Sequence, residues 1–210
     1  MTHYSLNGRP DFKRAKQYAL HRLERELSPV LVYHCLEHSR DEVMKAAERI
    51  ALLEGVTDES DLLLLRTAVL YHDLGYVVSF SDHEANSARM AAEVLPAFGY
   101  QSEQIEVICG LILATKLPQS PQTMLEQIIA DADLDVLGRR DFFERNFALL
   151  VELEGLGIII PVEQWQSDQL KFLLGHRYFT KAANDLRSAG KQKNIVRLQK
   201  LLLEAGIAVP

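Results

Sequence analysis

The chain has 210 residues, is 48% hydrophobic and 25% charged, and carries a formal net charge of −6 at pH 7. This composition fits a soluble globular protein with a sizeable core, whereas a nucleic-acid-binding surface would need clustered Lys and Arg. No run of residues reaches the ~18 to 20 apolar residues that a membrane-spanning helix needs.

The N-terminal residues and the cysteines indicate the compartment. The N-terminal sequence lacks the apolar core of a signal peptide. Cys35 and Cys109 match neither a disulfide framework nor a CxxC metal motif, so we expect two free thiols in a reducing environment. The sequence therefore predicts a cytoplasmic protein.

Helical periodicity runs through most of the chain, and no strictly alternating run is long enough to predict a strand. In chain order, helices are expected at residues 11–27, 39–54, 62–75, 83–98, 102–115, 123–137, 142–153, 162–175 and 180–203. The sequence predicts an all-α fold in a single domain over residues 1–210. Its core is expected at about residues 28–140, followed by a helical extension at about 141–210.

Several local signals refine these helices. Ser39 and Glu42 match a capping box, which would start the second helix at Ser39. Residues 76–82 and 116–122 are expected to be loops, the latter because it contains two prolines. Gly190 is expected to kink or divide the last helix, because glycine is a poor helix former.

The helix expected at residues 62–75, with the sequence LLLLRTAVLYHDLG, is the one around which the chain is organised. It is apolar on nearly all sides, which is typical of a central, buried helix. It ends in His72 and Asp73, and the charge of Asp73 has the wrong sign for a helix C-terminus. Because a buried charge is costly unless it is paired or bound to a metal, a cation close to these residues is expected.

Other residues are candidate partners for this pair. His34 and His38 are four positions apart and share one face if the helix around them is continuous. In the later acidic cluster, Asp133 and Asp135 lie nearer the buried face than Asp131, for which a solvated position is expected. Imidazole and carboxylate ligands together suit Mn, Fe, Co, Ni or Zn, and less readily Mg.

The motifs HSRDEV, AVLYHDLGY and ADADLDVLG, in this order, resemble those of the HD superfamily of metal-dependent phosphohydrolases. The resemblance implies an HD-domain helical bundle, here followed by a C-terminal helical extension. The divalent metal ligands that it implies are His38, His72, Asp73 and Asp133, with Asp131 as the alternative to Asp133.

The resemblance also implies catalytic roles. Tyr33-His34 is similar to the Tyr-His pair that precedes the first ligand in cyclic-nucleotide phosphodiesterases, so His34 is expected to donate a proton to the leaving group. Asp73, or else Asp133, is expected to accept a proton from a metal-activated water.

The chain also departs from parts of the superfamily pattern. His83 offers a ligand for a second ion, but residues 113–116 contain no histidine, so a single metal site is expected. No Gly-Tyr-Pro signature follows His72-Asp73, and this argues against the branch that degrades cyclic di-GMP.

A phosphate group also needs positive charge around it, which Lys and Arg usually provide. The expected substrate-binding residues are His83, Lys116, His176 and Arg177, with Arg139, Arg140 and Lys181 as further candidates.

The leading hypothesis is a hydrolase of a small-molecule phosphate mono- or diester, of a nucleotide-like kind. The alternatives are a catalytically silent HD domain that senses a ligand or binds a partner, and a purely structural helical domain. Leucines at positions 198, 201, 202 and 203 also predict self-association.

Overall fold

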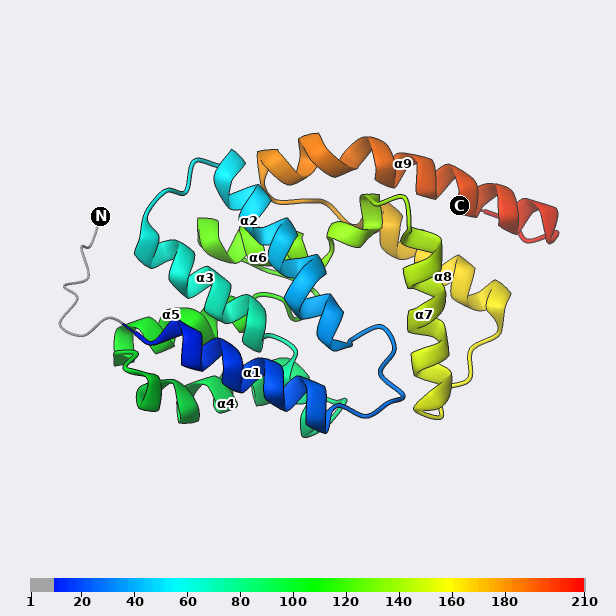
Figure 1. Cartoon of the computed structure of the whole chain (residues 1–210). Helices are drawn as coiled ribbons and strands as arrows, with labels where there is room; N and C mark the ends of the chain where they lie inside the picture. The colour runs from blue at the N-terminus through cyan, green and yellow to red at the C-terminus, as the bar shows by residue number, and fades with distance from the viewer. Residues whose placement is uncertain (1–9, 210) are drawn as a thin grey trace.

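The computed structural model describes residues 10–209, and the all-α prediction is confirmed for them (Figure 1). The α-helices are α1 (Phe12–Glu26), α2 (Met44–Leu53), α3 (Glu59–Tyr71), α4 (His83–Val94), α5 (Ser102–Leu113), α6 (Met124–Asp133), α7 (Phe142–Gly155), α8 (Val162–Gly175) and α9 (Lys181–Glu204). The shorter helical segments are the π-helix η1 (His38–Val43) and the 3-10 helices η2 (Leu74–Val77), η3 (Leu95–Phe98) and η4 (Asp135–Gly138). The predicted division into a core and an extension stays a prediction.

Helix α3 lies at the centre of the bundle, packed against α1, α2, α5 and α6 (Figure 1). Its residues from Leu64 to Tyr71 are all buried except Arg66, as expected for a helix that is apolar on nearly all sides. Burial of each such leucine contributes about 1.5–3 kcal/mol before entropic costs. The Tyr71 hydroxyl donates to the Ala15 carbonyl at 3.0 Å, which ties α3 to α1.

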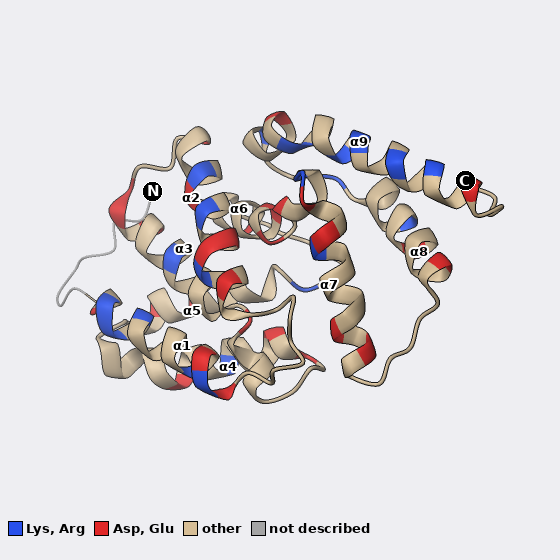
Figure 2. Ribbon diagram, turned by 45° about the vertical axis from the view of Figure 1, so that its right-hand side comes forward, with Lys and Arg blue, Asp and Glu red and all other residues tan. Residues whose placement is uncertain are grey.

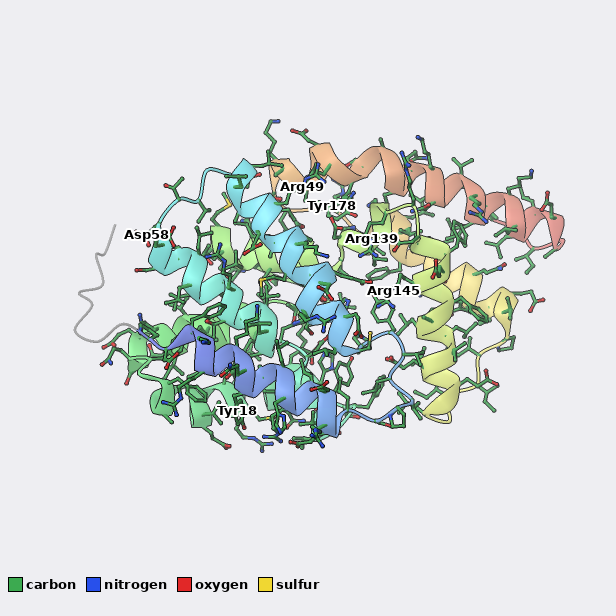
Figure 3. The ribbon with its side chains drawn as sticks, in the orientation of Figure 1. Tyr18, Arg49, Asp58, Arg139, Arg145 and Tyr178 are labelled. Atoms are coloured by element: carbon green, nitrogen blue, oxygen red, sulfur yellow. The ribbon has the colours of Figure 1, made fainter. Side chains whose placement is uncertain are left out.

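The bounds of α3 differ from the predicted 62–75. The helix begins earlier because the Asp58 side chain accepts hydrogen bonds from the Ser60 and Asp61 amides, at 2.8 and 3.1 Å (Figure 3). It ends at Tyr71, so that His72 and Asp73 lie just beyond its last turn. Part of the loop expected at residues 76–82 belongs instead to η2.

The capping box predicted at Ser39 is wrong. Ser39 is fully buried inside η1, and its hydroxyl has no hydrogen-bond partner among the described residues. Glu42 does not reach back to the Ser39 amide, because its carboxylate lies near the side chains of His38, Arg139 and Arg145.

Helix α9 packs against α8, η4 and α2 and covers one side of the bundle, with Lys and Arg residues along its length (Figure 2). The leucines expected to drive self-association are not all exposed: Leu198 and Leu202 are each 1% exposed and belong to the core, while Leu203 is 59% exposed. No helix within residues 10–209 combines the length and the apolar character that a bilayer crossing requires.

The prediction that Gly190 divides the last helix is wrong, since α9 runs unbroken through this position. The glycine instead allows a close approach between α9 and η4. A Cβ atom at Gly190 would lie 2.0 Å from the carbonyl oxygen of Gly138. The side chain of Asn194 fixes the same contact by donating to the carbonyls of Leu137 and Arg139, at 2.9 and 3.0 Å.

We expect Gly190→Ala to lower the free energy of unfolding by about 1–3 kcal/mol, because the added methyl group must push α9 away from a backbone carbonyl. Gly175→Ala is the matched control, because Gly175 is also helical but has nothing within 4 Å of the added Cβ. Alanine's better helix propensity should leave the control unchanged or stabilise it by up to about 1 kcal/mol. Urea denaturation measures both, and equal stabilities of the two variants would contradict the packing argument.

Candidate functional site

Four side chains from distant parts of the sequence converge beside the C-terminal end of α3. His38 comes from η1, His72 and Asp73 follow α3, and Asp133 is the last residue of α6. The Nε2 atoms of His38 and His72 both lie 3.3 Å from Asp133 Oδ1. Asp73 Oδ2 lies 3.2 Å from His72 Nε2 and 3.7 Å from His38 Nε2.

The donor atoms of this cluster fit a divalent metal ion. Ligand atoms bound at about 2.1 Å around one ion lie about 3.0–3.4 Å apart, close to the distances found here. The buried atoms His72 Nε2 and Asp73 Oδ2 have no hydrogen-bond partner among the described residues. Buried polar atoms normally have hydrogen-bond partners, so two unpaired atoms that face the same point fit a site whose ligands bind a metal ion.

The hydrogen bonds behind the two histidines turn their Nε2 atoms toward the cluster. His72 Nδ1 lies 2.8 Å from the carbonyl oxygen of Val69, which can only accept, so Nδ1 carries the proton. His38 Nδ1 lies 3.4 Å from Glu42 Oε2. In both residues Nε2 thereby faces the point where a metal would bind, a pattern typical of metal-binding histidines.

Two arginines hold Glu42 behind His38. Arg139 approaches Glu42 Oε2 and Arg145 approaches Glu42 Oε1, each at 3.3 Å (Figure 3). These charges and His38 outweigh the effect of burial and hold the pKa of Glu42 below its usual value. The carboxylate therefore stays ionised beside the histidine and orients its ring.

The electrostatics of the cluster compensate for burial. Burial alone would lower the pKa of His72 and raise that of Asp73, but their mutual attraction outweighs it and shifts both pKa values the other way. In the same way, Asp133 and His38 hold each other's charged forms, so the pKa of Asp133 is lowered and that of His38 is raised. Both carboxylates are thus ionised at neutral pH and available to a cation.

The two acids nearest Asp133 in the sequence, Asp131 and Asp135, have different partners. Asp131, the alternative ligand, is fully buried. The prediction of a solvated position for it is therefore wrong. The Asp131 carboxylate accepts hydrogen bonds from the Phe179 and Thr180 amides, at 2.9 and 2.8 Å, and from the Thr180 hydroxyl at 2.7 Å. Asp135 pairs with Arg187 at 2.5 and 2.8 Å. Only Asp133 of the three faces the histidines.

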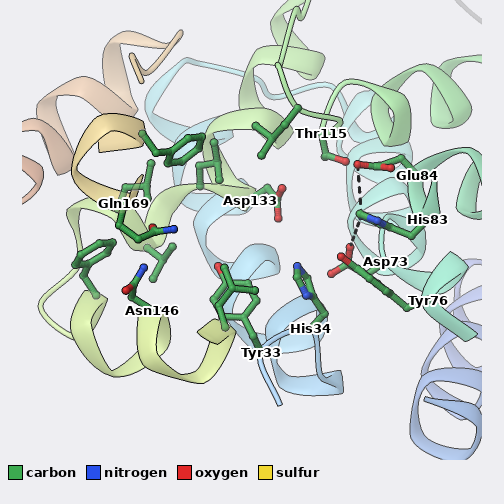
Figure 4. A pocket seen from close by; sticks show the side chains of 17 residues that line it. Tyr33, His34, Asp73, Tyr76, His83, Glu84, Thr115, Asp133, Asn146 and Gln169 are labelled. Atoms are coloured by element: carbon green, nitrogen blue, oxygen red, sulfur yellow. Dashed lines mark ion pairs between the residues drawn. The ribbon is translucent and has the colours of Figure 1, made fainter. Parts of the chain in front are cut away.

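A cavity of about 280 Å³ opens from this cluster toward α7 and α8 (Figure 4). The end of the cavity at the His/Asp cluster is polar and includes His34, Asp73, His83, Glu84 and Asp133. The rest of its wall is mostly apolar, formed by Tyr33, Leu134, Val136, Leu137, Phe142, Leu149 and Phe172, with the amides of Asn146 and Gln169. Among the described residues that line it, none is Lys or Arg.

His34 lies in the cavity wall and is held from behind by Glu152 of α7. The Glu152 carboxylate, fully buried, is 2.5 Å from His34 Nδ1 and accepts from the amides of Tyr33 and His34 at 2.8 and 3.0 Å. Arg145, which precedes Asn146 on α7, donates to the Tyr33 carbonyl at 2.8 Å and lies over the Tyr33 ring at 4.6 Å. The position of His34 therefore depends on α7.

His83, predicted as a substrate-binding residue, lies in the cavity wall beside the His/Asp cluster, and its role stays a prediction. Its Nε2 is 3.7 Å from Asp73 Oδ1 and 3.5 Å from Glu84 Oε1, and its ring stacks on Tyr76 at 4.0 Å (Figure 4). Burial lowers the pKa of His83. Lys116 is outside the cavity wall: its ammonium pairs with Asp82 at 2.7 Å, on the exposed surface.

His176 and Arg177, the other expected substrate-binding residues, do not line the cavity. His176 packs against Phe172 and Tyr178, and Lys191 Nζ donates to its carbonyl at 2.6 Å. Arg177 is exposed. The segment after α8 lies beside Asp131 instead, because Thr180, the N-cap of α9, donates hydrogen bonds to this carboxylate.

Several residues of the site were missed in the sequence. Glu152 lies in an apolar stretch of α7, and its spacing from Arg145 (seven positions) and Leu149 (three positions) was the available signal that it shares their inward face. Asn146 and Gln169 gave no signal, because isolated amides in amphipathic helices are common on protein surfaces.

The comparisons with known proteins agree with this geometry. The HD domain family profile matches residues 35–135, which include His38, His72, Asp73 and Asp133. A crystal structure from an uncultured Thermotogales bacterium, described as a predicted HD superfamily hydrolase, is 18% identical with a TM-score of 0.62 and covers 93% of each chain. A Lactobacillus plantarum protein is 17% identical with a TM-score of 0.64, covering 92% of this chain and 97% of its own. At these identities the likeness shows the fold alone, and a search of curated proteins gave no significant match.

We expect the purified protein to bind about one divalent ion per chain, and His72→Gln to lose it, because Nε2 supplies a ligand atom. Removing the ion by chelation should lower the free energy of unfolding of the wild type. The expected loss is about 2.7 kcal/mol, compared with the protein at a free ion concentration 100 times its Kd. The matched control is His21→Gln on the exposed face of α1. Elemental analysis and thermal unfolding measure both effects. Undiminished metal content in a folded His72→Gln variant would remove the metal site from consideration.

Proposed function

We propose that the protein is a phosphohydrolase acting on a small nucleotide-like phosphoester, because the profile of the HD domain, a domain of metal-dependent hydrolases, matches residues 35–135. The observation that carries the proposal is the cavity, which has the cluster of His38, His72 and Asp133 at one end and an apolar wall at the other. A phosphate group fits the first end, and an organic group fits the second.

His38, His72, Asp73 and Asp133 would hold the ion, which on donor chemistry is Mn, Fe, Co, Ni, Zn or Mg. When bound, a divalent ion supplies a Lewis acid for phosphoryl oxygens and lowers the pKa of a water molecule. The buried carboxylate of Asp73 and the half-buried carboxylate of Asp133 contribute two negative charges, which favour a cation at this position over a neutral arrangement.

Asp73 is placed to accept a proton from the attacking water. Its Oδ2 lies among the histidines, while its Oδ1 is turned toward His83, 3.7 Å away, on the cavity side. One oxygen can therefore contact the ion while the other receives a proton. His83 is the neighbouring group that would carry that proton onward or contact the phosphate.

His34 is placed to protonate the leaving group. Its Nδ1 is held by Glu152 at 2.5 Å, which leaves Nε2 as the atom that can donate into the cavity. Such a donor typically contributes about 10²–10⁴-fold to the rate. Glu152 acts through His34 and is a positioning residue.

The charge of the cavity favours a substrate with a single phosphate group. The described residues that line it include no Lys or Arg, so a bound ion would be its main positive group, with His34 and His83 as hydrogen-bond partners. A diphosphate or triphosphate would bring further negative charge without a clamp to balance it. We therefore propose a monophosphate, as a mono- or diester, and not a nucleoside triphosphate.

We expect phosphoester hydrolysis with added Mn, Co, Ni or Mg in the wild type, and a loss of at least about 10³-fold in kcat/KM in Asp73→Asn. A panel of nucleoside monophosphates, cyclic nucleotides and p-nitrophenyl phosphate tests this, with Asp61→Asn as a control at a carboxylate remote from the cavity. If no ester is hydrolysed faster by the wild type than by Asp73→Asn, the silent sensing domain replaces the enzyme as the proposed function.

The role of His34 predicts a dependence on the leaving group. We expect His34→Gln to slow the hydrolysis of an alkyl phosphate by about 10²–10⁴-fold, because an alkoxide needs a proton to depart. Hydrolysis of p-nitrophenyl phosphate should fall much less, since p-nitrophenolate leaves unaided. Steady-state kinetics on both esters measure the difference, and an equal loss on the two substrates would assign His34 to binding or structure.

A further inference from the structure

A second hollow of the molecule, of about 740 Å³, is lined by α2, by the connection from η4 to α7 and by α9. A volume of this size is typical of sites for small molecules. The described residues that line it include none that lines the cavity at the His/Asp cluster. Four acidic and six cationic side chains line this basic groove, the latter being Lys45, Arg49, Arg139, Arg140, Arg187 and Lys193. The groove is therefore positive on a chain whose net charge is −6, with Lys and Arg residues visible on both α2 and α9 (Figure 2).

The contact between α9 and η4 brings cationic residues together in the basic groove. Gly138 and Gly190 both line the groove, and a Cβ atom on either glycine would overlap the backbone of the other element. The approach that these glycines allow puts Lys193 of α9 and Arg140, which follows η4, in the wall of the same groove. Like charges that are brought together repel, so their convergence is unfavourable until an anion offsets it.

The acidic side chains of the groove cannot supply that anion, because each is already paired with an arginine. These pairs are Arg40–Asp41 at 2.6 Å, Arg139–Glu42 at 3.3 Å, Arg139–Asp141 at 2.9 Å and Arg187–Asp135 at 2.5 Å. Two of the six cationic side chains, Arg139 and Arg187, are thereby neutralised, and the others are not.

Three cationic side chains of the groove, Arg49, Arg140 and Lys193, have neither an ion-pair partner nor a hydrogen bond within residues 10–209. Each is exposed, and each belongs to a different wall of the groove. Lys45, one helical turn from Arg49, adds a fourth charge, since its ion pair with Asp41 is long, at 3.9 Å. A single exposed Lys or Arg is ordinary on a protein surface, but several around one hollow leave it with a positive potential.

We propose that the basic groove binds a small anion that carries two or more phosphate groups. Phosphoryl oxygens accept charge-assisted hydrogen bonds from Lys and Arg, and arginine can bind two of them at once. More than one phosphate group is needed because the unpaired charges lie on three elements, and Lys45 and Arg49 alone are about 6 Å apart along the axis of α2. The proposal goes beyond the proposed function and does not depend on it.

Inorganic tripolyphosphate is the probe, titrated by calorimetry into the wild-type protein as purified. We expect Arg49→Gln/Arg140→Gln/Lys193→Gln to bind it at least about 10-fold more weakly, because the charge-assisted hydrogen bonds of three cations are lost. Inorganic phosphate should also bind the wild type at least about 10-fold more weakly than tripolyphosphate, because it reaches fewer of these cations. Failure of the wild type to bind tripolyphosphate, or to prefer it over phosphate, would overturn the proposal.

The matched control is Lys13→Gln/Lys16→Gln/Arg25→Gln, which removes the same number of charges from exposed positions of α1, outside the groove. It should bind tripolyphosphate as the wild type does. All three proteins keep the His/Asp cluster, so any contact between the probe and an ion bound there is common to them. Equal affinities of the wild type and the groove variant, or an equal loss in both variants, would contradict a specific site.

Hydrogen–deuterium exchange locates the probe without any substitution. With saturating tripolyphosphate we expect slower exchange of backbone amides in residues 41–49, 138–141 and 186–194, which contain the lining residues of the groove. Slower exchange confined to residues 72–84 and 133–137, beside the His/Asp cluster, would overturn the proposal, and so would unchanged exchange throughout. Neither measurement uses hydrolysis, so the proposal and the proposed function can fail separately.

Discussion

The rest of the structure depends on keeping two carboxylates, Asp73 and Asp133, ionised inside the bundle. Burying such charges is costly unless each has a partner. Here two imidazoles lie within 3.7 Å of them, and the mutual attraction lowers the pKa of both acids despite burial. A bound divalent ion would fill the same need more completely, because it brings two positive charges to the point where the donor atoms converge.

The positions of these four side chains are fixed by neighbouring residues that are not themselves candidate metal ligands. The apolar body of α3 fixes the backbone of His72, and the Val69 carbonyl sets its ring. Glu42 sets the ring of His38 and is itself held by Arg139, which follows η4, and by Arg145 of α7. A chain of contacts thus runs from the His/Asp cluster to the C-terminal part of the protein, where Asn146 and Gln169 also line the cavity.

Local sequence was sufficient for what depends on periodicity and motif order. The all-helical fold and the central helix were predicted from apolar spacing, and the meeting of three sequence motifs was predicted from the resemblance to the HD superfamily. What depends on packing between distant helices was not accessible. Glu42 matched a capping box locally, yet Arg139 and Arg145 draw its carboxylate toward His38. Gly190 suggested a break in α9, yet it serves a contact with Gly138 that only the tertiary structure reveals.

The buried carboxylate of Asp131 connects α6 to the start of α9. It holds the backbone amides of Phe179 and Thr180, where α9 starts, and it lies two residues before Asp133 on the same helix. A fragment ending near residue 140 would leave this acid without those donors, on the helix that positions Asp133. The family profile matches residues 35–135, but contacts that hold the His/Asp cluster in place come from residues beyond this range. Transplanting that region alone into another protein would carry over the ligands without the parts that hold them in place.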